Sequence, residues 1–250
     1  MKENFLKIIF ILDESGSMQG TESDVIGGFN QFLEQQKAKA YEKSSVSLYK
    51  FNSSWSKIFS DLPLNEIRPL QPGDYTPGGL TALYDAIGIA ISEADKQNRH
   101  TRPGHIAESR PGLKAESKQE AAPEATSESK QEATAQSKPD MVMMVIITDG
   151  QENASREYDS RQVKRLIQEH EQNENWQFVY LGSDLSNFAD ADALGFKYKA
   201  SSYKANLQQK FNIVSEHAIL FRKCNLKEDK EQMMSDFVAD LEDNYKETEQ

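Results

Sequence analysis

Three short clusters of oxygen-bearing side chains are the part of this sequence best suited to chemistry. They are Asp13-Glu14-Ser15-Gly16-Ser17, Gly78-Gly79-Leu80-Thr81 and Thr148-Asp149-Gly150. Carboxylate and hydroxyl oxygens are the ligands that hard divalent cations prefer, and Mg²⁺ in particular keeps several waters and few direct carboxylates. With hydroxyls next to the ion and carboxylates behind water, the ion would stay electrophilic and would take one more anionic ligand from outside. The clusters therefore predict a metal site that is open to another molecule.

Each cluster adjoins an expected secondary-structure element. The first follows Phe5–Leu12 and the third ends Met141–Thr148, two near-continuous apolar runs typical of fully buried strands. The second precedes a helix marked by apolar residues at helical spacing, namely Leu83, Tyr84, Ile87, Ile91 and Ala94. Because ligands bind beyond the carboxyl ends of parallel strands, where the strand order reverses, we expect the three clusters to meet there.

The remaining segments alternate between strand and helix patterns. Helices are expected at about 24–40, 158–172, 188–194 and 203–221, and strands at 46–51, 55–59, 176–181 and 196–200. The strand at 55–59 is expected to pair antiparallel with 46–51 through the Asn52-Ser53-Ser54 turn. This alternation predicts an α/β fold of the doubly wound type, with a mostly parallel sheet and helices on both faces.

Two segments differ from this pattern. Residues 99–139 hold four of the eight prolines, no aromatic residue and two copies of Glu-Ser-Lys-Gln-Glu-Ala. We interpret them as a low-complexity, disordered insertion in a domain spanning 1–224, because they bury too little surface to offset their ordering entropy. Residues 225–250 carry nine acidic and three basic side chains and form an acidic C-terminal tail, with apolar residues on one helical face. A helix packed on its own domain is the expected arrangement.

Composition excludes several classes of protein. The net charge of −11 disfavours a nucleic-acid partner, because phosphates would be repelled. No run of eighteen apolar residues occurs, so we expect no membrane span. The start of the chain lacks a signal-peptide pattern, with Lys7 inside its apolar run and no small-residue cleavage site. Cys224 is the only cysteine, which fits a reducing compartment, with the cytoplasm as the default.

The three clusters, taken in order, resemble the metal-ion-dependent adhesion site of von Willebrand factor A domains. The matching pieces are Ile-Leu-Asp13-x-Ser15-x-Ser17, Gly-x-Thr81-Ala-Leu and Ile-Ile-Thr-Asp149-Gly. The resemblance covers about 5–221, with the insertion inside it, and is closest to small stand-alone bacterial and phage members. It implies a strand order of 3-2-1-4-5-6 with one antiparallel edge strand. It also implies that Ser15, Ser17 and Thr81 coordinate the ion, while Asp13 and Asp149 act directly or through water.

The same resemblance implies a function. Broader relatives bind proteins, often through a partner Asp or Glu that completes the metal shell. We therefore expect a metal-dependent protein-binding module that uses Mg²⁺, with Mn²⁺ as the alternative ion, and an unidentified protein partner that supplies a carboxylate. The alternative is a structural module whose metal only stiffens the loops. The sequence indicates no particular oligomeric state.

An enzyme is the remaining class, and the sequence does not favour it. Haloacid-dehalogenase-like phosphatases also carry an aspartate after the first strand, but they use a second acid two residues later, where this chain has Ser15. A serine hydrolase would need a nucleophile elbow, and no Gly-x-Ser-x-Gly occurs. No phosphate-binding P-loop occurs either. We therefore predict no catalytic residues.

Each cluster also has a simpler explanation. Asp13-x-Ser15-x-Ser17 and Thr81 are typical of helix N-caps, and Asp-Gly is a common turn pair. Among the neighbouring polar residues, Glu14 is expected to be a solvated side chain that does not touch the metal. Asp74 and Thr76 are expected to be ordinary loop residues, with the orientation of a water as the alternative, and Glu152 and Asn153 to shape either the rim or a turn. The joint occurrence of three clusters in one order favours the metal site.

Overall fold

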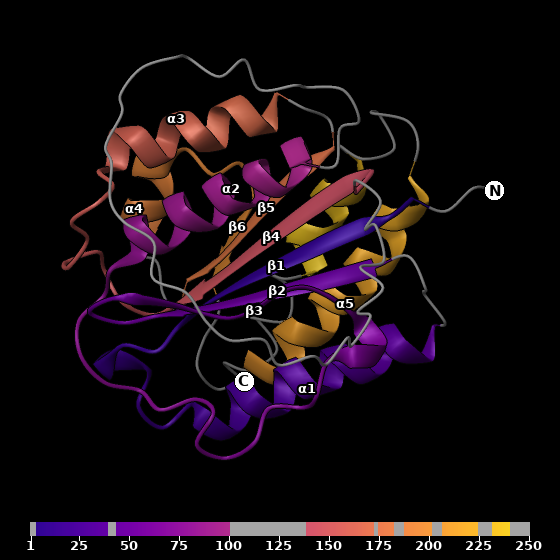
Figure 1. Ribbon diagram of the computed structural model, residues 1–250, viewed down its shortest axis with the longest axis horizontal. Helices are drawn as coiled ribbons and strands as arrows, with labels where there is room; N and C mark the ends of the chain where they lie inside the picture. Colours follow the sequence, from indigo (N-terminus) through magenta and orange to yellow (C-terminus); the bar gives the residue numbers. More distant parts are fainter. Residues whose placement is uncertain are drawn as a thin grey trace, which may run out of the picture.

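The computed structural model describes residues 4–39, 44–100, 139–172, 175–182, 188–201, 207–224 and 232–240. Its centre is a six-stranded sheet in the order β3-β2-β1-β4-β5-β6 (Figure 1). The strands are β1 (Leu6–Asp13), β2 (Ser44–Phe51), β3 (Trp55–Pro63), β4 (Met141–Thr148), β5 (Trp176–Gly182) and β6 (Lys199–Ser201). All neighbours are parallel except β3, which is antiparallel to β2. The predicted strand order and antiparallel edge are confirmed.

The two central strands explain the position of the polar clusters. Every residue of β1 and of β4 is buried, as expected for parallel strands covered on both faces. Leu12 pairs with Ile147, so Asp13 and Thr148 come next at the same edge of the sheet. Asp13 also pairs with Phe51 at the end of β2. Three strands thus end together, and the loops that follow them are brought close.

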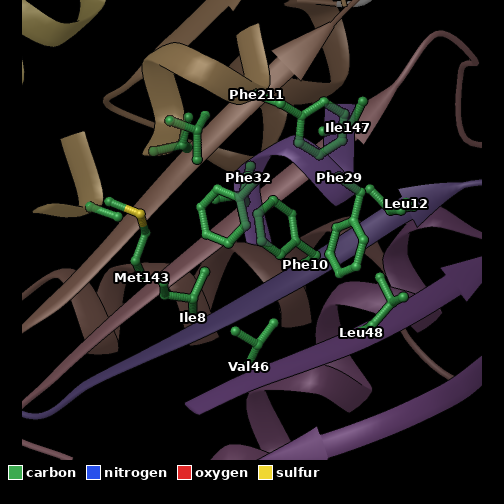
Figure 2. Packing of buried hydrophobic residues seen from close by; sticks show 14 of the residues in the cluster. Ile8, Phe10, Leu12, Phe29, Phe32, Val46, Leu48, Met143, Ile147 and Phe211 are labelled. Carbon is green, nitrogen blue, oxygen red and sulfur yellow. The ribbon is translucent and has the colours of Figure 1, made fainter. Parts of the chain in front are cut away.

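Helices cover both faces of the sheet, as predicted (Figure 1). One face carries α1 (Glu22–Ala38) and α5 (Leu207–Lys223), and the other carries α2 (Leu83–His100), α3 (Ser160–Glu171) and α4 (Phe188–Leu194). Short 3-10 turns occupy Gly16–Met18 and Leu64–Glu66. Four phenylalanines bind α1 and α5 to β1 (Figure 2): the ring of Phe10 lies 5.4, 4.8 and 5.9 Å from those of Phe29, Phe32 and Phe211. None of the helices in the described ranges has the length and apolar character of a bilayer span.

Boundaries differ from expectation where polar residues interrupt a pattern. β3 continues past 59 to Pro63 through a register shift and a residue with positive φ, Asp61 (φ 52°). β6 begins only at Lys199, because Phe196 is buried in the turn that ends α4. α2 extends to His100, two residues into the predicted insertion. Residues 101–138 lie outside the described residues, so their predicted disorder stays a prediction.

The C-terminal segment contributes a helix to the same core. Residues 232–240 are helical, and Met234 and Phe237 are buried within the cluster formed with α1 and α5. The ring of Phe237 stacks on that of His217 in α5 at 3.9 Å. This part of the acidic tail therefore packs on its own domain. Residues 225–231 and 241–250 lie outside the described part.

Candidate metal centre

Asp13, the last residue of β1, has a fully buried side chain held by hydrogen bonds. Its Oδ1 accepts the backbone N–H of Ser15 at 2.7 Å, and its Oδ2 accepts the hydroxyl of Thr148 at 2.6 Å. Burial raises the pKa of Asp13, these hydrogen bonds oppose the rise, and the nearby charge of Asp149 adds to it. No ion pair joins Asp13 to a Lys, Arg or His of the described residues, and the main interactions that stabilise its carboxylate are hydrogen bonds. The site thus holds buried negative charge that hydrogen bonds alone balance.

The two serines and Asp149 connect the first and third loops. The hydroxyls of Ser15 and Ser17 lie 3.0 Å apart. Ser17 donates to Oδ1 of Asp149 at 2.5 Å. Ser15 is buried, whereas Ser17 is exposed and Asp149 is half-buried. The oxygens therefore run from the interior to the surface.

Thr81 brings the second loop to the same place. A Cβ built on Gly150 would lie 2.7 Å from the Thr81 hydroxyl and 3.2 Å from that of Ser17. A side chain at position 150 would fill the space between these two oxygens, which is why glycine suits it. All five predicted site residues are thus brought together by the fold. Their role as metal ligands stays a prediction.

Backbone hydrogen bonds fasten the first loop to the second. The N–H of Gly16 donates to the carbonyl of Gly79 at 3.1 Å, and the N–H of Gly78 donates to the carbonyl of Glu14 at 2.9 Å. The Tyr75 hydroxyl donates to the carbonyl of Asp13, and burial raises the pKa of this tyrosine far above its ordinary value. These bonds fix the separation of the loops before any ligand binds.

Asn153 fastens the third loop to Thr81. Its side-chain Oδ1 accepts the N–H of Thr81 at 2.8 Å, and its own N–H donates to the Thr81 carbonyl at 3.0 Å. The neighbouring Glu152 accepts the N–H of Tyr84 at 2.8 Å, at the start of α2, and also accepts amides of its own loop. Sequence reasoning left both residues between a rim and a turn role. The structure shows that they connect loops. Local sequence patterns could not predict this, because the connected segments lie far apart in the sequence.

Acidic residues near the site are occupied by other partners. Glu14 accepts Nζ of Lys50 at 2.7 Å and the N–H of Thr76 at 2.6 Å. Asp74 forms a bidentate pair with Arg68 at 2.6 and 3.1 Å, which lowers the pKa of Asp74 to about 2. These carboxylates hold the loop before Thr81 in place and are not part of the five-residue cluster.

The donor set fits a hard divalent cation. Three hydroxyls and two carboxylates offer only oxygen, with no thiolate or imidazole, which suits Mg²⁺ better than a softer metal. Within the described ranges no group of three or more His, Cys, Asp or Glu side chains is placed to bind a metal. The candidate site has two acids, and its remaining oxygens are hydroxyls.

Comparisons with known proteins support the fold. No family model and no curated protein matches the sequence. Solved structures do match: a PilB minor pilin variant from Streptococcus sanguinis (12% identity, TM-score 0.55, 90% of this chain and 64% of that one) and a von Willebrand factor type A protein from Catenulispora acidiphila (14%, 0.51, 88% and 43%). The pilus adhesin SpaC from Lactobacillus rhamnosus GG is similar too (12%, 0.53, 88% and 30%). The chain spans less than two thirds of each of these proteins. It has a von Willebrand factor A-like fold.

Proposed function

We propose that this chain is a protein-binding module that holds Mg²⁺ at the carboxyl edge of its sheet. Asp13, Ser15, Ser17, Thr81 and Asp149 would hold the ion, with Mn²⁺ as the alternative, in a metal-ion-dependent adhesion site. Bound Mg²⁺ would supply an electrophilic position for an Asp or Glu carboxylate of a partner protein. The observation that carries the proposal is the convergence of these five residues from three loops around a buried, unneutralised carboxylate.

The predicted metal ligands and the residues that hold their loops have different roles. Asp13 and Asp149 supply the negative charge, and the three hydroxyls supply neutral oxygens that leave the ion able to accept another anion. The bonds of Gly16, Gly78 and Asn153 hold the loops so that little reordering accompanies binding. A binding role agrees with the occurrence of this fold in a pilus adhesin. We propose no catalytic role, because phosphatases with an aspartate after the first strand need a second acid two residues later, where this chain has Ser15. We also propose a reducing compartment such as the cytoplasm, because Cys224 is the only cysteine.

Affinity capture tests this function. The immobilised chain is incubated with candidate partners in Mg²⁺ or in chelator, beside an Asp149→Asn variant. We expect a partner that is retained by the wild type in Mg²⁺ only, and whose retention is lost when one of its acidic residues is changed to the amide. Retention that survives chelator would contradict metal-dependent capture.

The same experiment distinguishes the proposed binding function from the alternative in which the metal only stiffens the loops. The hydrogen bonds that already fasten the three loops disfavour this alternative, because they leave little stiffening for a metal to supply. It predicts that chelator lowers the melting temperature of the chain while partner retention stays the same. Melting temperature alone does not discriminate, because binding and folding are coupled.

A further inference from the structure

Four loop segments beside the candidate metal centre carry no exposed charged residue, although the exposed side chains of Arg68, Arg156 and Glu157 lie just beyond their ends. These loops are 14–21, 52–54, 71–81 and 149–153. Their exposed residues are Ser17, Gln19, Gly20, Ser53, Ser54, Gln71, Pro72, Gly73, Thr76, Gly79, Leu80, Gln151 and Asn153. These residues form a largely polar, uncharged rim beside the site.

The charged side chains of these loops are used internally. Glu14 pairs with Lys50, and Asp74 pairs with Arg68. Glu152 accepts backbone amides, and Asp149 belongs to the site itself. Lys50 and Arg68 are thus already paired with carboxylates of the chain, although the Arg68 side chain is 67% exposed.

Leu80 is the large hydrophobic residue on this rim. Its side chain is 55% exposed. The other large hydrophobic residues exposed in the described part are Ile58, midway along β3, and Leu220, near the end of α5. A single exposed leucine is common on protein surfaces. The position of Leu80 is what matters, because it directly precedes the predicted metal ligand Thr81.

The backbone fixes Leu80 in this position from both sides. The N–H of Leu80 donates to the hydroxyl of Ser53 at 2.9 Å, and the carbonyl of Gly79 accepts from Gly16. Gly79 has a φ of +82°, and a Cβ there would lie 2.7 Å from the Ser53 hydroxyl. On the other side, Asn153 holds the N–H of Thr81. The segment is thus ordered without packing of the leucine side chain, whose apolar surface is free for a partner to cover.

We infer that the partner presents a single acidic residue with an apolar side chain beside it. The carboxylate enters the metal centre while the apolar side chain covers Leu80. A run of acidic residues is disfavoured, because the chain carries a net charge of −11 and Lys50 and Arg68 are already paired with its own carboxylates. This inference rests on the proposed function and specifies the chemistry of its partner.

Peptide selection tests it directly. A phage-displayed random heptapeptide library is bound to the full chain loaded with Mg²⁺ and eluted with chelator. We expect peptides with one Asp or Glu, a Leu, Ile, Met or Phe within two positions, and no second acid. A peptide of that consensus is then titrated into wild type, Leu80→Ser and the matched control Leu220→Ser. Leu80→Ser removes the apolar contact made by the exposed half of the leucine side chain, so it should weaken peptide binding about fivefold to tenfold. Leu220→Ser should leave peptide binding unchanged.

The outcomes separate the two proposals. Chelator-eluted acidic peptides without an apolar neighbour, peptides with acidic runs, or equal binding by wild type and Leu80→Ser would overturn this inference and leave the proposed function intact. Equal weakening by both leucine variants would overturn it as well. If a chain that calorimetry shows to carry Mg²⁺ selects no chelator-sensitive peptide, the proposed function fails and the inference fails with it.

Discussion

Strand β1 carries a buried charged side chain near each end, and the two are balanced differently. At its start, Lys7 is 3% exposed, and its Nζ lies 2.7 and 2.9 Å from the two oxygens of Asp61. Burial lowers the pKa of Lys7, and the charge of Asp61 opposes that shift. At its end, Asp13 is fully buried and has hydrogen-bond donors, but the charge that shifts its pKa most is the like charge of Asp149.

The difference separates structural from functional charge. A buried ion needs an opposite charge or a good set of hydrogen bonds, and the Lys7 pair has its counter-ion inside the fold. The Asp13 end has the hydrogen bonds but lacks the counter-ion. A cation from solution would complete it, which is why we propose ion binding at this end of the strand and a structural role for the other.

Substitution at the two ends should change stability in different ways. Lys7→Met leaves Asp61 without its buried partner and should lower the free energy of unfolding by about 3 kcal/mol. Asp13→Asn keeps an acceptor for the Ser15 amide and removes a buried charge, so the metal-free chain should keep or gain stability. Urea denaturation in chelator measures both. A large loss for Asp13→Asn would break the comparison.

A double variant provides the control for the Lys7 end. Lys7→Met combined with Asp61→Asn removes both charges, and asparagine tolerates the positive φ at position 61. We expect it to recover most of the stability that Lys7→Met loses, because replacing both members of a buried pair costs far less than removing one. No recovery would show that the lysine contributes by packing.

Mg²⁺ binding at the Asp13 end of β1 can be weakened without changing a predicted ligand. Asn153→Ala removes the acceptor for the Thr81 amide and should reduce Mg²⁺ affinity by roughly 10-fold to 100-fold, the range for outer-shell partners of metal ligands. Asp85→Asn is the matched control, since Asp85 accepts amides of Arg156, Glu157 and Tyr158 further along the same segment. It should lower stability and leave Mg²⁺ affinity unchanged. Equal losses of Mg²⁺ affinity in Asn153→Ala and Asp85→Asn would show that the segment as a whole, rather than the Asn153 hydrogen bond to Thr81, supports the site.

A third buried titratable group, His217, sharpens the comparison because it avoids charge altogether. Burial lowers the pKa of His217 to about 3, beside Phe237 and the amide of Gln177. The unfolded chain binds this proton near pH 6.5, so the contribution of His217 is complete above that pH and is lost as pH falls toward 3. Between pH 6.5 and 5.5 the loss should be about 1 kcal/mol. Denaturation across this range should show a smaller pH dependence for His217→Gln, and an equal slope would contradict the assignment.

Much of this architecture is predictable from local sequence. The apolar runs of β1 and β4 and the clusters that end them predict buried parallel strands and the meeting of Asp13, Ser15, Ser17, Thr81 and Asp149. The strand order itself is implied by the resemblance to von Willebrand factor A domains. Period and composition carry that information, because buried parallel strands and loop oxygens are visible along the chain.

The supporting contacts are not predictable in this way. The Lys7–Asp61 pair joins residues 54 positions apart, and the Thr81–Asn153 pair joins residues 72 positions apart. In the sequence alone, Lys7 is only a polar interruption of an apolar run, and Leu80 is an ordinary loop residue. Their roles depend on which segments the fold places together.

The most direct test of the account is calorimetric titration of the chelator-stripped chain with Mg²⁺, beside Asp13→Asn. We expect about one ion per chain for the wild type and no binding heat for the variant, with both proteins folded. Binding that is equal in the two proteins would place the ion elsewhere. A folded wild type that binds no Mg²⁺, even with a carboxylate ligand such as acetate present, would contradict the metal centre itself.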